Sequence, residues 1–392
     1  MAPVPAKAAG DSNPADGMAE ASAPSRPPRL QSAVALRALA TVFVVVIHTT
    51  HWPPSAALFD NLDTLGRFAV PAFMLLTGVL LSYQYGGSRL RAGDFLRRRF
   101  SRTLVPWLAW APVYAVFGWF FSTEPQHTAA GLLSFVSYGA GHLWFLLLIP
   151  QMYLVYLVWP RRHLWWWAAG ALALQTALCV YRLYGPMPAG FVDQFFLWHG
   201  FQLLPFWIGY FAVGVAAGRT LVRRGEPSEV RWPAMVGAVV AVAISGWLLV
   251  TVSYGGAPNG DFQVGTGGFL LPQEPLFVLA IATLVWLVGR RLMSIGGPLV
   301  AGIALLSDNS LGIYILHPIL VFAIGRQMSG LLNPGLPLSF VGFLLLTVGG
   351  LLAATLASLF LRATPLAVSI GVSRRSLALP RTRASSPRSA AG

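Results

Sequence analysis

Ten long apolar stretches dominate the sequence and restrict it to one kind of fold. They lie at 33–52, 66–84, 103–122, 142–160, 163–182, 200–218, 233–253, 273–289, 300–325 and 338–361. Each is close to the roughly 20 mainly apolar residues that a helix needs to cross the hydrocarbon core of a bilayer. A helix satisfies its own backbone hydrogen bonds where water is absent. We therefore expect an all-α integral membrane protein with about ten transmembrane helices.

The distribution of basic residues supports the same helix count. The chain has 27 Lys and Arg against 13 Asp and Glu, a net charge of +14, although only 10% of its residues are charged. Cytoplasmic connections of membrane proteins are enriched in Lys and Arg. If the N-terminus is inside, ten spans put every basic residue on that side except Arg37, Arg67, Arg182 and Arg326. The sequence therefore predicts two cytoplasmic termini, and with this hydropathy we expect no nucleic-acid partner.

Two segments fall outside the apolar stretches. Residues 1–32 are rich in Ala, Pro, Ser and Gly and lack the apolar content that a folded unit needs. Residues 362–392 have a similar composition with more Arg. We expect disordered, basic cytoplasmic tails at 1–32 and 362–392, on either side of one membrane domain at 33–361. Membrane lipids are expected partners, and the oligomeric state is left open.

The first apolar stretch contains two ionisable residues, Arg37 and His48. Such residues inside a span are costly and point to function. In an α-helix their spacing corresponds to ~16 Å along the axis and about three turns, so both side chains project from one face. Arg binds phosphates or carbonyl oxygens, and His accepts a proton near neutral pH. The alternative is structural: Arg37 reaches the inner headgroups, and His48 hydrogen-bonds a neighbouring helix.

A basic segment leads into the third apolar stretch and ends with Arg99 and Arg102. Residues three apart are neighbours on one face of a helix. Two such guanidinium groups can hold the phosphates of a cytosolic ligand by bidentate contacts. The alternative interpretation is an anchor for anionic lipids.

Further polar residues occur at the depth of the apolar stretches. Tyr314 and His317 can share one face of the ninth stretch, and His142 and Trp144 open the fourth. Two acids, Glu274 and Asp308, lie closest to membrane depth. Either acid could orient a histidine, as in a catalytic pair, or neutralise an arginine. No metal-ligand motif such as HExxH occurs, so we expect chemistry without a metal.

Five motifs in order resemble the membrane acyltransferase-3 family. The first is the Arg37/His48 pair with ten residues between. The others are Val70-Pro71-Ala72-Phe73, Arg99-Phe100-Ser101-Arg102, His142-Leu143-Trp144-Phe145, and Ser310 to Tyr314 followed by His317. Ala72, Met74 and Thr77 depart from the family's usual second motif. The similarity extends over about residues 33–361.

The resemblance implies an integral membrane O-acyltransferase that moves an acyl group, with acetyl expected, from cytosolic acetyl-CoA to a hydroxyl. It implies that Arg99 and Arg102 hold the CoA phosphates. It also implies that Arg37 lines the pantetheine path or polarises the thioester carbonyl, and that His48 is a general base or a transient acyl carrier. The candidates for lining the substrate cavity are His142, Trp144, Tyr314, His317, Glu274 and Asp308.

The segment from His48 to Trp52 and the lack of an extra domain resemble the family's enzymes that O-acetylate cell-surface polysaccharides. We therefore expect a glycan or glycolipid acceptor and a multi-pass protein of a bacterial cytoplasmic membrane. Two alternatives stay open. One is acylation of a small secondary metabolite such as a macrolide, and the other is non-enzymatic transport of a polysaccharide or lipid-linked intermediate.

Overall fold

The computed structural model describes residues 28–53, 56–86, 90–121, 128–137, 139–185, 199–226, 232–252, 268–333 and 335–372. These residues form helices and no strand. Nine helical segments among them are long and apolar enough to cross a membrane. The prediction of an all-α membrane protein is therefore confirmed. The greater part of each predicted tail, residues 1–27 and 373–392, lies outside the described residues.

Each of the ten predicted stretches corresponds to one long helix. These helices are α1 (Gln31–Thr49), α3 (Ala69–Tyr85), α5 (Leu104–Phe121), α7 (Phe145–Val158), α8 (Leu164–Tyr184), α10 (Ile208–Arg224), α11 (Trp232–Thr251), α13 (Glu274–Ser294), α14 (Gly297–Gln327) and α16 (Leu336–Arg362). The shorter α-helices are α2 (Ala57–Gly66), α4 (Ala92–Phe100), α6 (Ala129–Ser137) and α15 (Ser329–Leu332). The sixth stretch gives a helix of only 17 residues, because Pro205 holds Leu204–Phe206 in a 3-10 turn before α10 begins.

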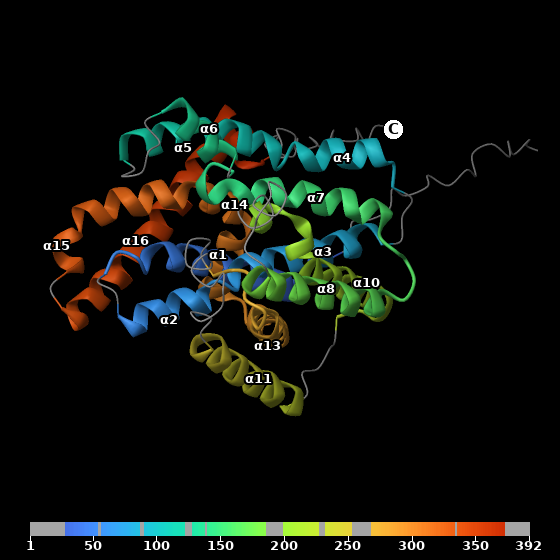
Figure 1. The fold of residues 1–392 in the computed structure, drawn as a ribbon. Coiled ribbons are helices and arrows are strands. Elements are labelled where there is room, and N and C mark those ends of the chain that lie inside the picture. Colours follow the sequence, from blue (N-terminus) through green and yellow to red (C-terminus); the bar gives the residue numbers. More distant parts are fainter. Residues whose placement is uncertain are drawn as a thin grey trace, which may run out of the picture.

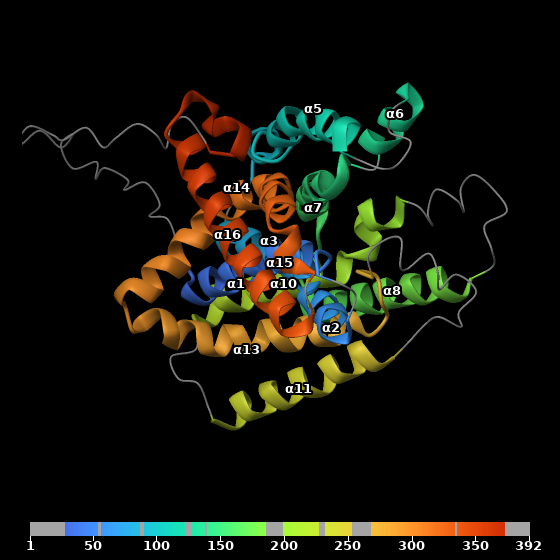
Figure 2. The same ribbon diagram turned by 90° about the vertical axis from the view of Figure 1, so that its left-hand side faces the viewer.

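Helix α1 lies at the centre of the bundle. It packs against α3, α13, α14 and α16, and Leu36, Ala40 and Val45 are fully buried along it. Figures 1 and 2 show α11 on one side of the molecule and α5 and α6 on the opposite side. The helix with the two ionisable residues is therefore shielded by protein on most of its surface.

Helices α3 and α10 approach each other at three glycines. A Cβ atom at Gly78 would overlap the carbonyl oxygen of Phe211, one at Gly214 would overlap that of Leu75, and one at Gly218 that of Val79. Small residues spaced by four allow this close backbone approach between membrane helices, where no hydrophobic effect drives association. The Gly214–Gly218 spacing therefore fixes α10 against α3.

Helix α14 is continuous through the polar residues that interrupt the ninth stretch. Asn309 is buried, its Nδ2 donates to the carbonyl of Leu305 at 2.8 Å, and its Oδ1 accepts from Ser358 Oγ at 3.2 Å. The polar groups are thus satisfied within α14 and by α16, and the helix does not break there.

The start of the predicted C-terminal tail is ordered, in contrast to the expectation for 362–392. A 3-10 helix, Pro365–Ile370, follows α16, and Ile370 is buried. Trp110 Nε1 of α5 donates to the carbonyl of Ser369 at 3.1 Å. The prediction failed here because the segment contains apolar residues that dock on α5, and composition averaged over the whole tail hid them.

Candidate active site

Three histidines from three distant parts of the chain meet in the bundle. The ring centroids of His48 and His317 are 4.7 Å apart, those of His142 and His317 are 5.5 Å apart, and those of His48 and His142 are 6.0 Å apart. We call these residues the histidine cluster. The sequence-predicted candidates His48, His142, Tyr314 and His317 are therefore in one place, since Tyr314 contacts both His142 and His317.

His48 lies one residue before the end of α1. The next residue, Thr49, is held on α16 by a hydrogen bond of 2.8 Å between its Oγ1 and that of Thr347. His48 is half-buried as a residue, and no hydrogen bond of its ring is found among the described residues. It is the one ring of the histidine cluster that is left free for a substrate.

His142 is directed into the bundle by an unusual loop. Gly139, Ala140 and Gly141 have φ values of 87°, 58° and 67°, all in the left-handed region. Glycine adopts this region readily, whereas alanine pays about 1–2 kcal/mol. Ala140 is fully buried and precedes the 3-10 helix Gly141–Trp144, which carries His142. Such backbone strain is concentrated at functional sites, where the surrounding structure maintains it.

Backbone carbonyls of α14 orient the other two histidines, and the carbonyl of Tyr314 contacts both. Pro318 has no N–H group, so the carbonyl of Tyr314, four residues earlier in α14, receives no helical hydrogen bond. His142 Nε2 lies 3.0 Å from this oxygen, and His317 Nδ1 lies 2.9 Å from it. His317 Nδ1 also lies 3.0 Å from the carbonyl of Ile313. The hydroxyl of Tyr314 in turn donates to the carbonyl of His142. Hydrogen bonds therefore run in both directions between α14 and the loop that carries His142.

These contacts assign the protons of the two neutral rings. A carbonyl oxygen only accepts, so His142 carries its proton on Nε2 and His317 carries its proton on Nδ1. The remaining nitrogen of His317, Nε2, then has a free lone pair. It is completely buried and has no hydrogen-bond partner among the described residues. Leaving a buried acceptor without a hydrogen bond costs free energy. The result of this arrangement is a proton-accepting nitrogen beside His48.

Tyr114 of α5 closes one side of the histidine cluster. Its ring lies 4.7 Å from that of His142, and its hydroxyl donates to the carbonyl of Ile315 at 2.6 Å. Sequence reasoning missed Tyr114. It is one tyrosine within a run of apolar and aromatic residues, and no spacing distinguishes it there.

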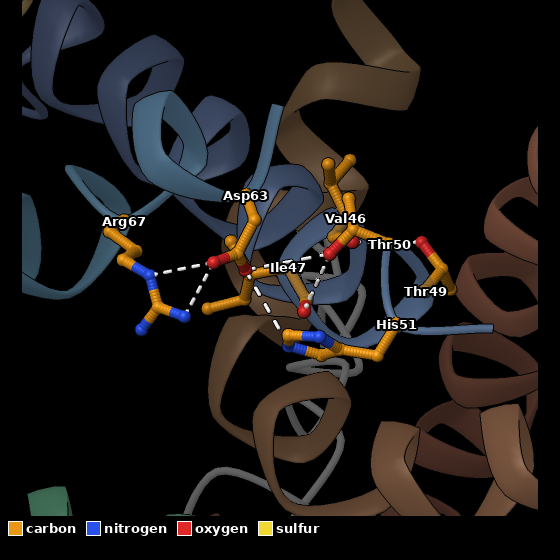
Figure 3. A network of polar contacts seen from close by, with 7 residues as sticks. All are labelled: Val46, Ile47, Thr49, Thr50, His51, Asp63 and Arg67. Atoms are coloured by element: carbon orange, nitrogen blue, oxygen red, sulfur yellow. Dashed lines mark hydrogen bonds and ion pairs between the residues drawn. The ribbon is translucent and has the colours of Figure 1, made fainter. Parts of the chain in front are cut away.

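A polar network flanks the histidine cluster where α1 ends (Figure 3). Asp63 of α2 accepts from Arg67 Nε at 2.9 Å, and its other oxygen lies 3.6 Å from His51 Nε2 and 3.4 Å from Thr50 Oγ1. Both Asp63 and Arg67 are mostly buried, whereas the His51 side chain is 66% exposed. The pair was not predicted, although its spacing of four residues is typical of a helical ion pair. The contact of Thr50 with Asp63 connects the end of α1 to α2.

Three predicted arginines are arranged around Tyr153 of α7, toward the start of α1. Arg37 and Arg99 both act electrostatically on Tyr153, and so does Arg102. Arg99 donates to Gln84 Oε1 at 2.8 Å and lies over the rings of Tyr85 and Tyr153. The side chain of Arg102 is exposed. No hydrogen bond of the Arg37 guanidinium is found among the described residues, which leaves it available for a ligand.

The three other candidates have different surroundings. Asp308 forms an ion pair of 2.6 Å with Arg29 and does not partner His48. Glu274 begins α13 and is 2% exposed. Neither of its carboxylate oxygens has a hydrogen-bond partner in the described part of the chain. The charged residue that acts on it is Arg67. Trp144 stacks on Trp207 at 5.6 Å. Spacing could not show these differences, because each depends on which helices are neighbours.

The arrangement as a whole is that of a multi-pass membrane enzyme. Basic side chains lie toward one end of its central helix, and a cluster of proton-accepting rings lies at the other. Among the described residues, no group of three or more His, Cys, Asp or Glu could hold a metal ion.

A family model described as an acyltransferase domain, that of the acyltransferase-3 family, matches residues 33–362, and the chain belongs to this family. It is therefore a membrane acyltransferase. Comparison with curated proteins and with solved structures gave no match.

Proposed function

We propose that the protein moves an acyl group, with acetyl expected, from cytosolic acyl-CoA to a hydroxyl of a cell-surface glycan or glycolipid in the bacterial cytoplasmic membrane. The observation that carries the proposal is the histidine cluster, in which His48 has a free ring and His317 has a buried, unpaired Nε2. Proton acceptors at this depth of an apolar bundle suit the removal of a proton from a hydroxyl.

In the proposed reaction, the acceptor oxygen attacks the thioester carbonyl carbon while His48 takes the hydroxyl proton. The carbon–sulfur bond then breaks, and the CoA thiolate leaves and takes up that proton. His142 and His317 each have one ring nitrogen bonded to a backbone carbonyl, which fixes the two rings in place. Their proposed task is to hold the His48 imidazole at the angle that the reaction needs.

The arginines supply the proposed donor site. Arg99 and Arg102 would bind phosphates of CoA by charge-assisted hydrogen bonds. Arg37 would contact the pantetheine arm or the thioester carbonyl, since its guanidinium has no partner among the described residues. The ~16 Å between Arg37 and His48 along α1 is of the same order as an extended pantetheine arm. One acyl-CoA molecule could therefore contact both ends of the helix.

The test is a His48→Ala variant that still inserts in the membrane. We expect acyl transfer from radiolabelled acetyl-CoA to membrane glycans to fall by about 10²–10⁴-fold, the usual contribution of a general base. The matched control is His51→Ala, which removes a neighbouring but exposed imidazole outside the histidine cluster. Near-normal transfer by His48→Ala would rule out His48 as the base, and transport of a glycan without any acyl transfer would rule out the proposed function.

A further inference from the structure

A groove lined by arginines lies away from the histidine cluster, between the start of α8 and the end of α10. Its arginines are Arg161, Arg162, Arg219, Arg223 and Arg224, and Trp165 and Trp166 also line it. We call it the arginine groove. None of its lining residues is acidic. It therefore concentrates positive charge on a concave surface, where an anion with several charges would be bound.

The first turn of α8 adds to this positive charge. The 21-residue helix begins at Leu164 with no side-chain cap and no acidic residue in its first turn. Its N-terminal N–H groups and the positive end of its dipole favour phosphate groups. His163, which precedes the helix, has a φ of 53° and lines the groove. The backbone is therefore in a costly conformation at the point where an anion would be held.

The arginine groove adjoins a second, smaller pocket on the side of the predicted donor site. Arg161, Leu164 and Arg219 also line this second pocket, which includes Tyr85 and Tyr156. Arg99 donates to the hydroxyl of Tyr85 at 3.3 Å, and its guanidinium lies 5.9 Å from the centre of the Tyr153 ring. Tyr153 also interacts electrostatically with Arg37. Lining residues therefore connect the arginine groove with Arg99 and, through Tyr153, with α1.

We propose that the arginine groove binds the 3′-phosphoadenosine end of acyl-CoA, next to the diphosphate that Arg99 and Arg102 would hold. The proposal rests on the proposed function and deepens it. This end carries a phosphate monoester, which matches Arg161, Arg162, Arg223, Arg224 and the uncapped N-terminus of α8. The guanidinium of Arg219 already donates to the carbonyl of Gly86. The exposed faces of Trp165 and Trp166 offer surfaces on which an adenine ring can stack. The shared lining toward Tyr85, which accepts a hydrogen bond from Arg99, favours CoA over a lipid headgroup.

The experiment measures binding, so it does not require the acceptor. The full-length protein in phosphatidylcholine nanodiscs is titrated with CoA and with dephospho-CoA, which lacks the 3′-phosphate. We expect the wild type to bind CoA about tenfold more tightly or better, because a hydrogen bond to a charged group contributes about that factor. A triple variant, Arg162→Gln, Arg223→Gln and Arg224→Gln, should lose this preference. The control Arg97→Gln with Arg98→Gln changes exposed arginines of α4 outside the groove and should keep it.

Each result decides the proposal. A triple variant that keeps the wild-type preference for CoA overturns it. So does a triple variant that loses only the binding of added phosphatidylglycerol, because the groove would then be a lipid site. A single Arg162→Gln variant guards against misfolding of the triple variant and should show a smaller loss in the same direction. If the wild type binds no CoA at all, the proposed function itself fails, and this result is distinct from the others.

Discussion

At the scale of single residues, Pro318 determines the geometry of the site because it has no backbone N–H. The Tyr314 carbonyl is therefore free to accept from both His142 and His317. The same residue weakens α14, since proline inside a helix costs about 3 kcal/mol relative to alanine. Proline at position 318 therefore lowers the stability of α14 but frees the carbonyl that positions two histidines.

Replacing Pro318 tests this opposition. In Pro318→Ala the new backbone N–H would bond to the Tyr314 carbonyl and compete with both histidines. We expect a higher melting temperature in detergent and a drop of about tenfold or more in acyl transfer, because misplaced catalytic groups cost rate steeply. The control is Pro112→Ala in α5, an exposed proline inside a helix, which should stabilise the protein without loss of activity. Full activity in Pro318→Ala would contradict this account of the site.

The residues of the site differ in how far the sequence predicts them. The spacing of Arg37 and His48 predicts one helical face, and the structure describes both in the single helix α1. The sequence predicted that His317 lines the same cavity as His48. Spacing could not predict their direct contact, because it depends on the packing of α1 on α14, far apart in the chain. The direction of His142 depends on a left-handed Ala140, which nothing in an alanine signals. The flanking Gly139 and Gly141 were the available hint.

At the scale of helices, the α3–α10 pair is the tightest contact described, and three glycines make it possible. In Gly214→Leu the side chain would meet the backbone of Leu75, which cannot move aside. We expect destabilisation by about 3 kcal/mol or more and loss of the monodisperse peak in size-exclusion chromatography. Gly237→Leu in α11 is the matched control, because a Cβ there meets nothing within 4 Å. Equal behaviour of the two variants would show that glycine is not required at the interface.

Helices were predictable as elements, but their ends were not. Apolar length identified the long helices, because the bilayer imposes it, and nine helical segments in the described part of the chain are long and apolar enough to span. Pro205 shortened the sixth, and polar residues did not interrupt the ninth, because Asn309 finds partners in α14 and α16. Whether a polar residue ends a helix or is satisfied inside the bundle depends on the neighbouring helix, and one sequence does not show which helices are neighbours.

At the scale of the whole molecule, the predicted orientation has a direct test. The chain has one cysteine, Cys179, which is buried, so Cys179→Ser provides a background without a thiol. In that background, Asn61→Cys should react with a membrane-impermeant maleimide in intact cells. Arg162→Cys should react only after permeabilisation, because the distribution of basic residues predicts that it is cytoplasmic. The opposite labelling pattern would invert the topology.

The central position of α1 also has a consequence for biosynthesis. This helix leaves the ribosome before the others, yet it packs on α14 and α16. At about 5–20 residues per second, the interval between the synthesis of α1 and that of α16 is on the order of tens of seconds. During this time Arg37 and His48 lack the surfaces that later enclose them. A nascent chain must therefore be sheltered in the insertion machinery, or be held at the headgroups by its arginine, until its last helix arrives.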